Sequence, residues 1–538
     1  MTSRGAATDG YPPRVTVVPL PLPPADLRIA DLDGRRVGVW GAGREGGAAV
    51  LALRRYAPAA RVVVVTDGPP ADGATTFVPA GAGAPPGGSP PADDDADRPW
   101  PAWLHGPAGI DALEACDVVI RSPGVPVRGA DADRLRAAGV TITGGTALWM
   151  AERTTAETVI GVTGTKGKST TSSLLHHLLG HVGIRSRLAG NIGVPLLEQL
   201  RPDDPPEVWV VELSSYQLAD LPRAPTVAVM TNLRRDHLPW HGDEATYHHD
   251  KLRILGGPDG DGPRMAVLSA ADPALVAAGD AYTARGGVVL WTDRPTGLHV
   301  RDGALRDGDR TLARIDDLPV RGVTGARDVA LALEAVRSVG YDPADLGAAL
   351  RGFAPLRHRQ DVVHDADGVR WVDDSISTTP DATLAALAAF APGPVVLVAG
   401  GVDRDQRHDE LAATLALGRV PSGVDGDPDL DLRVAGLVAL PGTGHALADA
   451  VGRAAAAAGR AAPPIHRVDA ASAGGDPPDR GAVVMTDAVD AARRMATPGA
   501  TVLLSPAAPS HGLFRDFEDR GRRFADAARG APSAAVDA

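Results

Sequence analysis

The stretch that decides the fold is Gly161-Val162-Thr163-Gly164-Thr165-Lys166-Gly167-Lys168-Ser169-Thr170. It follows a β-branched run at 158–163, which predicts a strand, and it leads into an expected helix at about 168–181. Glycines in such a loop let backbone N–H groups point at phosphate oxygens, and the start of the helix adds positive potential. The pattern therefore predicts nucleotide binding, although Val162 stands where the strict phosphate-loop spacing needs glycine. The alternative is an ordinary strand–helix turn.

Lysine usage singles out the same loop. Only three of the 54 basic residues are lysines, Lys166, Lys168 and Lys251, and the other 51 are arginines. Arginine replaces lysine where charge alone is needed, but not where a compact amine must fit a phosphate cradle or react as a neutral base. The three lysines are therefore candidates for chemistry, against the alternative of chance survival at the surface.

Composition excludes several classes of protein. A net charge of −13 disfavours nucleic acid and anionic lipid as main partners. The single cysteine, Cys116, excludes a disulfide framework and lies in an apolar run that indicates a buried residue. No apolar run approaches 18 residues, and prolines interrupt the one near the N-terminus, so neither a membrane span nor a signal peptide is expected. We expect a cytoplasmic monomer that acts on small molecules.

Strands alternate with helices along the chain, which predicts an α/β fold with three domains. The expected first domain is Rossmann-like and covers 1–155, with 1–30 and a Pro/Gly/Asp-rich stretch at 68–100 flexible. A central phosphate-loop domain is expected at 156–354. A second Rossmann-like domain is expected at 355–538, with an acidic loop at 421–431 whose order the sequence does not decide.

A second glycine motif lies in the first domain. Gly41-Ala42-Gly43-Arg44-Glu45-Gly46 follows the expected strand 36–40 and fits the dinucleotide-binding pattern, a weak signal when alone. Asp67 ends the next strand, a few residues later than the acidic residue of an NAD fingerprint. The motif is compatible with NAD, but also with a substrate that carries a pyrophosphate, such as a UDP-sugar.

The ordered motifs over about 35–530 resemble those of the Mur ligases of peptidoglycan synthesis. They comprise the loop at 164–170, Gly190-Asn191-Ile192-Gly193, Glu212-Leu213-Ser214-Ser215, Asp236-His237, Tyr247 with Lys251, His358-Arg359, Asp373-Asp374-Ser375 and Phe514–Gly521. The resemblance implies a domain for a UDP-sugar, one for ATP and one for an incoming amino acid. It implies an ATP-dependent ligase that adds glutamate to the alanyl carboxylate of UDP-N-acetylmuramoyl-L-alanine through an acyl phosphate.

Site residues follow from the resemblance by position. It implies catalytic roles for Lys168, His237 and Lys251, the last as a carbamate. Two Mg²⁺ ions are expected on Ser169, Glu212, His237 and carbamylated Lys251. ATP is expected on Gly164, Thr165, Lys166, Gly167, Lys168, Ser169, Thr170, Arg359 and Asp374. Substrate contacts are expected from Gly41, Gly43, Asp67, Ser122, Pro123, Gly124, Asn191, Thr378, Arg404, Ser510 and Phe517.

The sequence departs from the family pattern in the third domain. Ile376 stands where glutamate ligases of the family usually carry a lysine, and Arg404 is the nearest cation to the position of another. The adenine-side Gly-x-His-Asn pattern becomes Gly325-Ala326-Arg327-Asp328, which leaves the base contacts open. The segment 373–380 and the Leu-Pro-Trp-His-Gly run at 238–242 resemble a branch that adds L-glutamate, the isomer we favour.

Three other hypotheses stay open at this point. The chain is alternatively a D-glutamate-adding ligase with a drifted pocket, or a ligase similar to folylpolyglutamate synthase, which shares the central ATP domain. A non-catalytic nucleotide-binding protein is the third, but it predicts loss of Glu212, His237 or Lys251, and all three are present.

Overall fold

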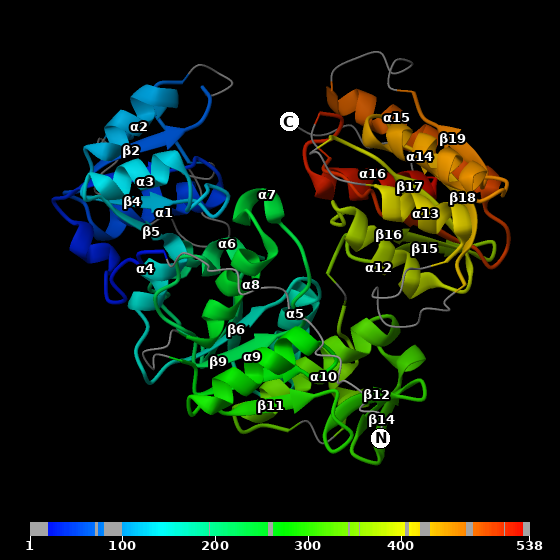
Figure 1. The fold of residues 1–538 in the computed structure, drawn as a ribbon, viewed down its shortest axis with the longest axis horizontal. Coiled ribbons are helices and arrows are strands. Elements are labelled where there is room, and N and C mark those ends of the chain that lie inside the picture. The colour runs from blue at the N-terminus through cyan, green and yellow to red at the C-terminus, as the bar shows by residue number, and fades with distance from the viewer. Residues whose placement is uncertain are drawn as a thin grey trace, which may run out of the picture. The chain divides into compact units, whose positions relative to one another are not determined.

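A computed structural model describes most of the 538 residues (Figure 1). The described residues are 20–69, 74–79, 99–192, 194–256, 262–342, 345–354, 356–403, 408–419, 431–469, 477–510 and 512–530. Most of the stretch predicted as a flexible insertion, most of the acidic loop at 421–431 and residues 1–19 lie outside them. Within 20–30, Ile29 is buried where the short helix η1 begins and belongs to a hydrophobic core.

The chain divides by its internal contacts into two compact units. The first comprises residues up to His299 together with Arg306–Arg310 and Arg327–Ala349, and the second comprises Val300–Leu305, Thr311–Ala326 and the chain from Leu350. The α/β class is confirmed by its mainly parallel sheets with helices between the strands. The domain boundaries near 155 and 354 stay predictions.

The first sheet is parallel and has the strand order β3-β2-β1-β4-β5. Its three central strands are short runs rich in valine and isoleucine, as expected where helices cover both faces. They are β1 (Arg36–Trp40), β2 (Arg61–Thr66), β3 (Ala102–His105), β4 (Val118–Arg121) and β5 (Thr141–Gly144). The helices are η1 (Ile29–Leu32), α1 (Arg44–Tyr56), α2 (Gly106–Glu114), α3 (Ala130–Ala137) and α4 (Gly145–Ala151).

The second sheet is also parallel, in the order β11-β10-β9-β6-β8-β7, and carries the phosphate loop after β6. Its strands are β6 (Thr158–Thr163), β7 (Ser186–Gly190), β8 (Val208–Glu212), β9 (Val227–Met230), β10 (Met265–Ser269) and β11 (Val289–Thr292). The helices are α5 (Lys168–His181), η2 (Leu196–Gln199), α6 (Ser215–Leu218), α7 (Leu238–His241), α8 (Glu244–Leu252), η3 (Arg253–Leu255) and α9 (Pro273–Ala284).

A small three-stranded sheet follows, and helices α10 and α11 come after it. Its strand order is β12-β13-β14. The elements are β12 (Leu298–Arg301), β13 (Ala304–Asp307), β14 (Arg310–Arg314), η4 (Ile315–Asp317), α10 (Gly322–Ser338) and α11 (Leu346–Leu350).

The last sheet has the order β15-β16-β20-β17-β18-β19, and only β15 runs antiparallel to its neighbour. Its strands are β15 (Asp361–Ala366), β16 (Val369–Asp373), β17 (Pro394–Ala399), β18 (Arg433–Ala439), β19 (Ile465–Arg467) and β20 (Thr501–Leu504). The helices are α12 (Pro380–Phe390), α13 (Asp409–Leu417), α14 (Thr443–Ala457), α15 (Pro477–Met495) and α16 (Phe517–Arg529).

One hydrophobic core runs through the first unit and joins its two sheets. It extends from η1 and α1 through the edge-to-face pair Trp149 and Trp209 to residues of the central sheet such as Val211 and Met230. Two other cores lie on the two faces of the last sheet. In open parallel sheets, ligands bind beside the loops that follow the carboxyl ends of the strands, so functional residues are expected at those edges.

Candidate active site

The phosphate loop has the strand–loop–helix context that the sequence predicts. Strand β6 ends at Thr163 and α5 begins at Lys168. Gly164 has a φ of 151°, and a Cβ there would lie 1.8 Å from the Thr231 hydroxyl. Gly167 has a φ of 84°, and its Cβ would lie 2.4 Å from an Asp328 carboxylate oxygen. Both positions therefore require glycine, and the loop keeps the tight backbone that phosphate binding needs.

The two lysines of the loop have different partners. Lys168 Nζ donates to the Thr165 carbonyl at 3.1 Å, so its amine folds back over the loop. Lys166 Nζ lies 3.4 Å from Asp236, and its backbone N–H donates to the Asn232 side chain at 2.9 Å. The loop itself therefore holds the Lys168 amine in place. This position is suitable for binding a phosphate group in the loop.

Lys251 is buried beneath the loop. The residue is 1% exposed, and its Nζ donates to the Gly164 carbonyl at 2.6 Å. Burial, with a further contribution from the charge of Lys168, holds the pKa of Lys251 well below its ordinary value. The lowered pKa favours the neutral amine, which is the form that reacts with CO₂.

Glu212 ends strand β8, next to the phosphate loop. Val162 is its partner in the neighbouring strand β6. Its Oε1 accepts a hydrogen bond of 2.7 Å from the Asn191 side chain. Its Oε2 is buried and accepts no hydrogen bond from any described residue. A buried carboxylate oxygen without a donor is costly, so this atom is suited to a hard cation such as Mg²⁺.

His237 lies in the loop after β9, with a φ of 53°. Its Nδ1 is 3.0 Å from the Tyr216 hydroxyl. Burial lowers the pKa of His237 to about 4, so the ring is neutral at physiological pH. Burial alone would raise the pKa of Asp236, but the charge of Lys166 and the hydrogen bond from the His237 backbone contribute to a net lowering of that pKa. A neutral imidazole with one nitrogen hydrogen-bonded has the form of a metal-ligating histidine.

The predicted Mg²⁺ ligands come from neighbouring strand ends. Glu212 is the last residue of β8, Ser169 lies in the first turn of the helix after β6, and His237 follows β9, the other neighbour of β6. Within the part of the chain that the structure describes, no cluster of three or more His, Cys, Asp or Glu side chains is gathered as a metal site. The expected set does not require one, because it includes a hydroxyl and a carbamate.

In the first domain, the glycine motif and the Ser122-Pro123-Gly124 turn lie together. Gly41 has a φ of 105°, and a Cβ there would lie 2.7 Å from Ser122. The Ser122 hydroxyl donates to the Gly41 carbonyl at 3.2 Å. Gly43 caps the start of α1, whose N-terminus favours an anion. These loops follow the adjacent strands β1 and β4 and form one edge of the sheet.

Asp67 follows β2, which pairs with β1 on the other side. Its carboxylate is exposed, one residue past the strand end. The three adjacent strands β2, β1 and β4 therefore bring all the predicted substrate residues of this domain to one edge, although no direct contact joins Asp67 to Ser122 in the structure.

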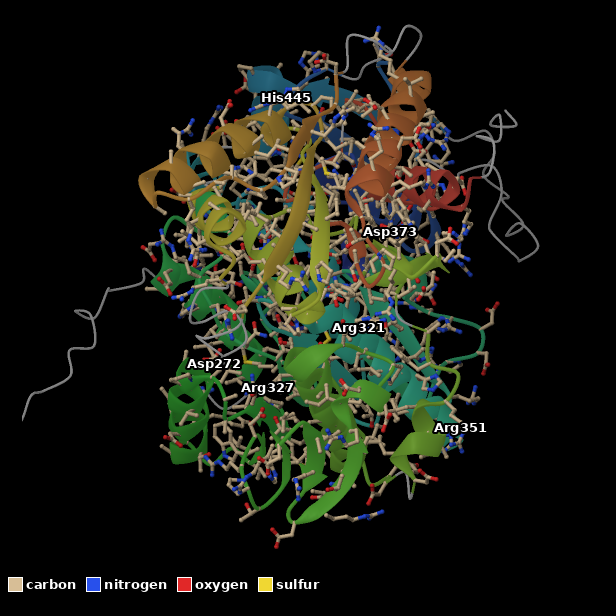
Figure 2. All side chains as sticks on the ribbon, turned by 90° about the vertical axis from the view of Figure 1, so that its right-hand side faces the viewer. Asp272, Arg321, Arg327, Arg351, Asp373 and His445 are labelled. Atoms are coloured by element: carbon tan, nitrogen blue, oxygen red, sulfur yellow. The ribbon has the colours of Figure 1, made fainter. Side chains whose placement is uncertain are left out.

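The adenine-side residues have partners within the first unit. Arg327 and Asp272 are labelled in Figure 2. Arg327 pairs with Asp293 at 3.2 Å, and Asp272 caps α9 while accepting from the Leu233 backbone. Asp328 is buried and accepts a bond of 3.2 Å from Thr171 of α5. The Arg327-Asp328 pair that replaces the usual pattern is thus built into the surroundings of the phosphate loop.

In the second unit, Asp374 follows β16 at the carboxyl edge of its sheet. Its oxygens accept bonds from the Ser505 hydroxyl at 2.7 Å and the Gln360 backbone at 3.2 Å. Asp373, labelled in Figure 2, lies 2.6 Å from His358 Nδ1. The positive charge of Arg359 lowers the pKa of Asp374, against the larger effect of burial, which raises it. The predicted nucleotide contacts of Arg359 and Asp374 stay predictions.

The described part of the predicted amino-acid pocket comes from the same edge. Thr378 precedes α12, whose N-cap is Thr379. Ser510 is buried after β20, and Phe517 begins α16 with its ring 6.1 Å from that of His358. Arg404 lies outside the described residues. Ile376, which stands where a lysine was expected, donates its backbone N–H to the His358 carbonyl.

The comparisons with known proteins agree on one family. Residues 162–288 match the Mur ligase middle domain. The UDP-N-acetylmuramoyl-L-alanine–L-glutamate ligase of Xanthomonas euvesicatoria pv. vesicatoria is 37% identical over 523 residues, which cover 94% of this chain and 98% of that protein. The chain belongs to the Mur ligase family. Ligases of the same name from a Micromonospora species and from Salinispora tropica are also 37% identical, over 521 and 520 residues.

Solved Mur ligases have the same fold. The UDP-N-acetylmuramate–alanine ligase of Thermotoga maritima has a TM-score of 0.52 at 17% identity, covering 92% of this chain and 99% of that one. The MurF ligase of the same organism, solved in complex with ADP, has a TM-score of 0.50 at 16% identity and covers 94% and 99%. Among the described residues, no helix is long and apolar enough to cross a membrane.

Two buried arginines of this Mur ligase were missed by the sequence reasoning. Arg121 ends β4 and is 2% exposed, and its guanidinium makes two bonds of 2.8 Å to Asp220 of the central domain. Arg520 is fully buried in α16 and donates to Ser375 and to the Ala508 carbonyl. For Arg121 the only sequence signal was its place at the end of an apolar strand, Val118-Val119-Ile120-Arg121. Arg520 lies within the motif Phe514–Gly521, but no role was assigned to it.

The Asp374 carboxyl group is expected to make the stability of the folded protein depend on pH. Burial raises its pKa to about 6, above an unfolded value of about 4. The folded protein therefore binds this proton more tightly, and the stability that the proton contributes is present below pH 4 and lost as the pH rises through 6. We expect Asp374→Asn to gain about 2 kcal/mol of unfolding free energy relative to wild type between pH 4.5 and 7.5. Chemical denaturation at both pH values measures this difference, and a pH-independent difference would contradict it.

Proposed function

We propose that this chain is an ATP-dependent ligase that adds L-glutamate to the alanyl carboxylate of UDP-N-acetylmuramoyl-L-alanine, a step of peptidoglycan precursor synthesis. The observation that carries the chemistry is the buried Lys251 amine bonded to the Gly164 carbonyl of the phosphate loop. The substrates are supported by the 37% identity, over nearly the whole chain, to ligases named for that reaction.

In the first step the alanyl carboxylate attacks the γ-phosphorus of ATP, and ADP leaves. The reaction needs positioning and charge neutralisation more than covalent help from the protein. The loop backbone and Lys168 would hold the β- and γ-phosphates, and Asn191, fixed by Glu212, would contact a phosphate or the carboxyl group. The product of this step is an acyl phosphate.

Lys251 would act as a carbamate. Its neutral Nζ attacks CO₂, a C–N bond forms, the nitrogen loses a proton to water, and the amine becomes an anionic oxygen ligand. Ser169, Glu212, His237 and the carbamate would then hold two Mg²⁺ ions, whose charge would stabilise the phosphates as they react. The orphan Glu212 Oε2 supports this assignment.

In the second step the α-amine of glutamate attacks the acyl carbonyl, the C–O bond to phosphate breaks, and phosphate leaves with the bonding pair. The amine's protons go to solvent or to the leaving phosphate. Thr378, Ser510 and Phe517 are proposed to bind the glutamate, and Arg404 to supply a cation. The first-domain edge with Gly41, Gly43, Asp67, Ser122, Pro123 and Gly124 is proposed to bind the UDP portion.

The isomer of glutamate follows from the departures in the third domain. Ile376 removes a charge that an arginine-for-lysine bias would have kept, so the pocket differs from that of the usual glutamate ligases. The full-length relatives carry L-glutamate in their names. We propose small-molecule substrates alone, with the protein working as a cytoplasmic monomer. A D-glutamate ligase is the second candidate, and the test separates the two.

The test supplies UDP-N-acetylmuramoyl-L-alanine and ATP with either L- or D-glutamate and follows phosphate release. We expect release with L-glutamate that exceeds release with D-glutamate at least about tenfold, and none when the acceptor is omitted. Activity with D-glutamate alone would replace the L-isomer in the proposal. Release with neither isomer would refute the substrate assignment and favour a folylpolyglutamate-type ligase or a non-catalytic nucleotide-binding protein.

A further inference from the structure

A buried carboxylate lies one residue before Lys251. Asp250 is fully buried in α8 and accepts hydrogen bonds from two side chains. Arg128 of the first domain forms a two-pronged pair with it, at 2.7 and 2.8 Å. His241 Nδ1 lies 2.8 Å from the same carboxylate, and His241 Nε2 lies 3.0 Å from the Ser215 hydroxyl. We call Arg128, Asp250, His241 and Ser215 the Asp250 network.

The network holds the helix that carries Lys251. Consecutive helical residues point about 100° apart, so α8 can present Asp250 to the first domain while Lys251 faces the phosphate loop. On the side of α8 that faces the phosphate loop, Lys251 donates a hydrogen bond to the Gly164 carbonyl. On the side that faces the first domain, Asp250 accepts a hydrogen bond from Arg128. The last turn of α8 is therefore fixed from two directions.

The same segment of the first domain makes further contacts with the central domain. Arg128 follows the Ser122-Pro123-Gly124 turn by four residues, and the Trp240 indole N–H donates to the Gly124 carbonyl at 3.1 Å. Trp240 and His241 both belong to α7, which directly follows His237. Segment 122–128 is thus tied both to the helix of Lys251 and to the turn beside His237.

An ion pair with one fully buried partner is weak evidence for added stability. The Asp250 carboxylate is fully buried while the Arg128 side chain is 25% exposed, and the cost of desolvating the carboxylate offsets much of the attraction, so a pair that is retained needs another reason. Reacting groups must be held within about 0.5 Å of the productive geometry, and small misplacements cost large factors in rate. The Asp250 network lies beside Lys251, so holding that residue in place is a reason for the pair to be retained.

We propose that Asp250 and Arg128 are positioning residues, which hold Lys251 in register with the first-domain loop that binds the UDP-linked substrate. The inference rests on the proposed ligase function and goes beyond it, because it assigns a role to residues outside the expected catalytic set. Without the pair, α8 still forms, but the Lys251 amine is no longer held at one distance from the phosphate loop.

The test compares Arg128→Gln and Asp250→Asn with Arg134→Gln in the full-length protein. Arg134 is the matched control, because it also pairs with two acidic oxygens, those of Asp111 and Glu114, but at the exposed surface. The measurements are kcat, KM for ATP, the melting temperature, and the Lys251 carbamate signal in NMR spectra recorded with ¹³C-bicarbonate and no ATP.

For Arg128→Gln we expect kcat to fall at least about tenfold with KM for ATP unchanged within about twofold. The bicarbonate concentration that half-saturates the carbamate signal should rise at least about fivefold, and high bicarbonate should restore part of kcat. The double variant with Asp250→Asn should be no worse than the worse single variant, because both changes remove one shared interaction. Arg134→Gln should match wild type.

Any one of three results would overturn the inference. The first is that Arg128→Gln behaves as Arg134→Gln does. The second is that kcat falls only in proportion to the loss of folded protein while the carbamate signal is unchanged, and the third is that the wild type shows no carbamate signal. Failure of the proposed function is distinguishable, because it removes ligase turnover with glutamate in wild type. The carbamate signal and its response to Arg128→Gln would still be measured in that case.

Discussion

Replacing Lys251 with Met is expected to lower turnover at least about 10³-fold while the protein stays folded. The residue is 1% exposed and its amine is bonded to the Gly164 carbonyl. Methionine fills a similar volume without charge, but it cannot form a carbamate. The measurements are the rate of ADP formation with both substrates and the melting temperature of the variant.

Lys251→Arg separates charge from carbamate chemistry. Arginine keeps a cation but is not a neutral amine at any ordinary pH, so turnover should be lost here too. Because the site is buried, this variant should also melt at a lower temperature than the methionine variant. Wild-type turnover should depend on bicarbonate. Near-normal turnover in either variant would refute the carbamate role.

Glu212→Gln is expected to lower kcat about 10²- to 10³-fold and to raise the Mg²⁺ concentration needed for half-maximal activity at least about tenfold. Glutamine keeps the shape of the side chain, and its amide oxygen can still accept from Asn191. What is lost is the charge on the orphan oxygen Oε2. The measurement is turnover against Mg²⁺ concentration at saturating substrates.

Glu207→Gln is the matched control for Glu212→Gln. Glu207 directly precedes the same strand β8 and is exposed, so losing its charge should change neither kcat nor the Mg²⁺ dependence. An unchanged Mg²⁺ dependence in Glu212→Gln would contradict its role as a metal ligand. A change of equal size in both variants would indicate a general electrostatic effect instead.

The features that could be predicted from the sequence are those set by neighbouring residues, such as strands and the phosphate loop. Runs dominated by β-branched or aliphatic residues, such as 158–163 and 501–504, are strands because buried parallel strands need apolar residues on both faces. The phosphate loop was recognised from its glycines, and its position between β6 and α5 is confirmed. Lys251 was singled out by the scarcity of lysine, and the structure brings its amine to the Gly164 carbonyl, 87 residues earlier in the chain.

Contacts between the first and central domains could not be read from the sequence. Arg121 and Asp220 are 99 residues apart, and Arg128 and Asp250 are 122 apart. Neither the period of a strand nor that of a helix shows which charged residue will meet a partner at that separation. The adenine side was left open for a related reason, since the partner of Arg327 is Asp293, at the end of a different strand.

The central claim is that an acyl phosphate precedes the peptide bond, and an isotope experiment tests it most directly. The substrate is UDP-N-acetylmuramoyl-L-alanine labelled with ¹⁸O in both oxygens of its alanyl carboxylate. It is supplied with ATP, Mg²⁺ and L-glutamate, and the masses of the products are measured by mass spectrometry. The account predicts one ¹⁸O atom in each phosphate released and one glutamate in each product, because the carboxylate oxygen that attacks phosphorus leaves with it. Unlabelled phosphate, or a labelled phosphate without the glutamate product, would contradict it.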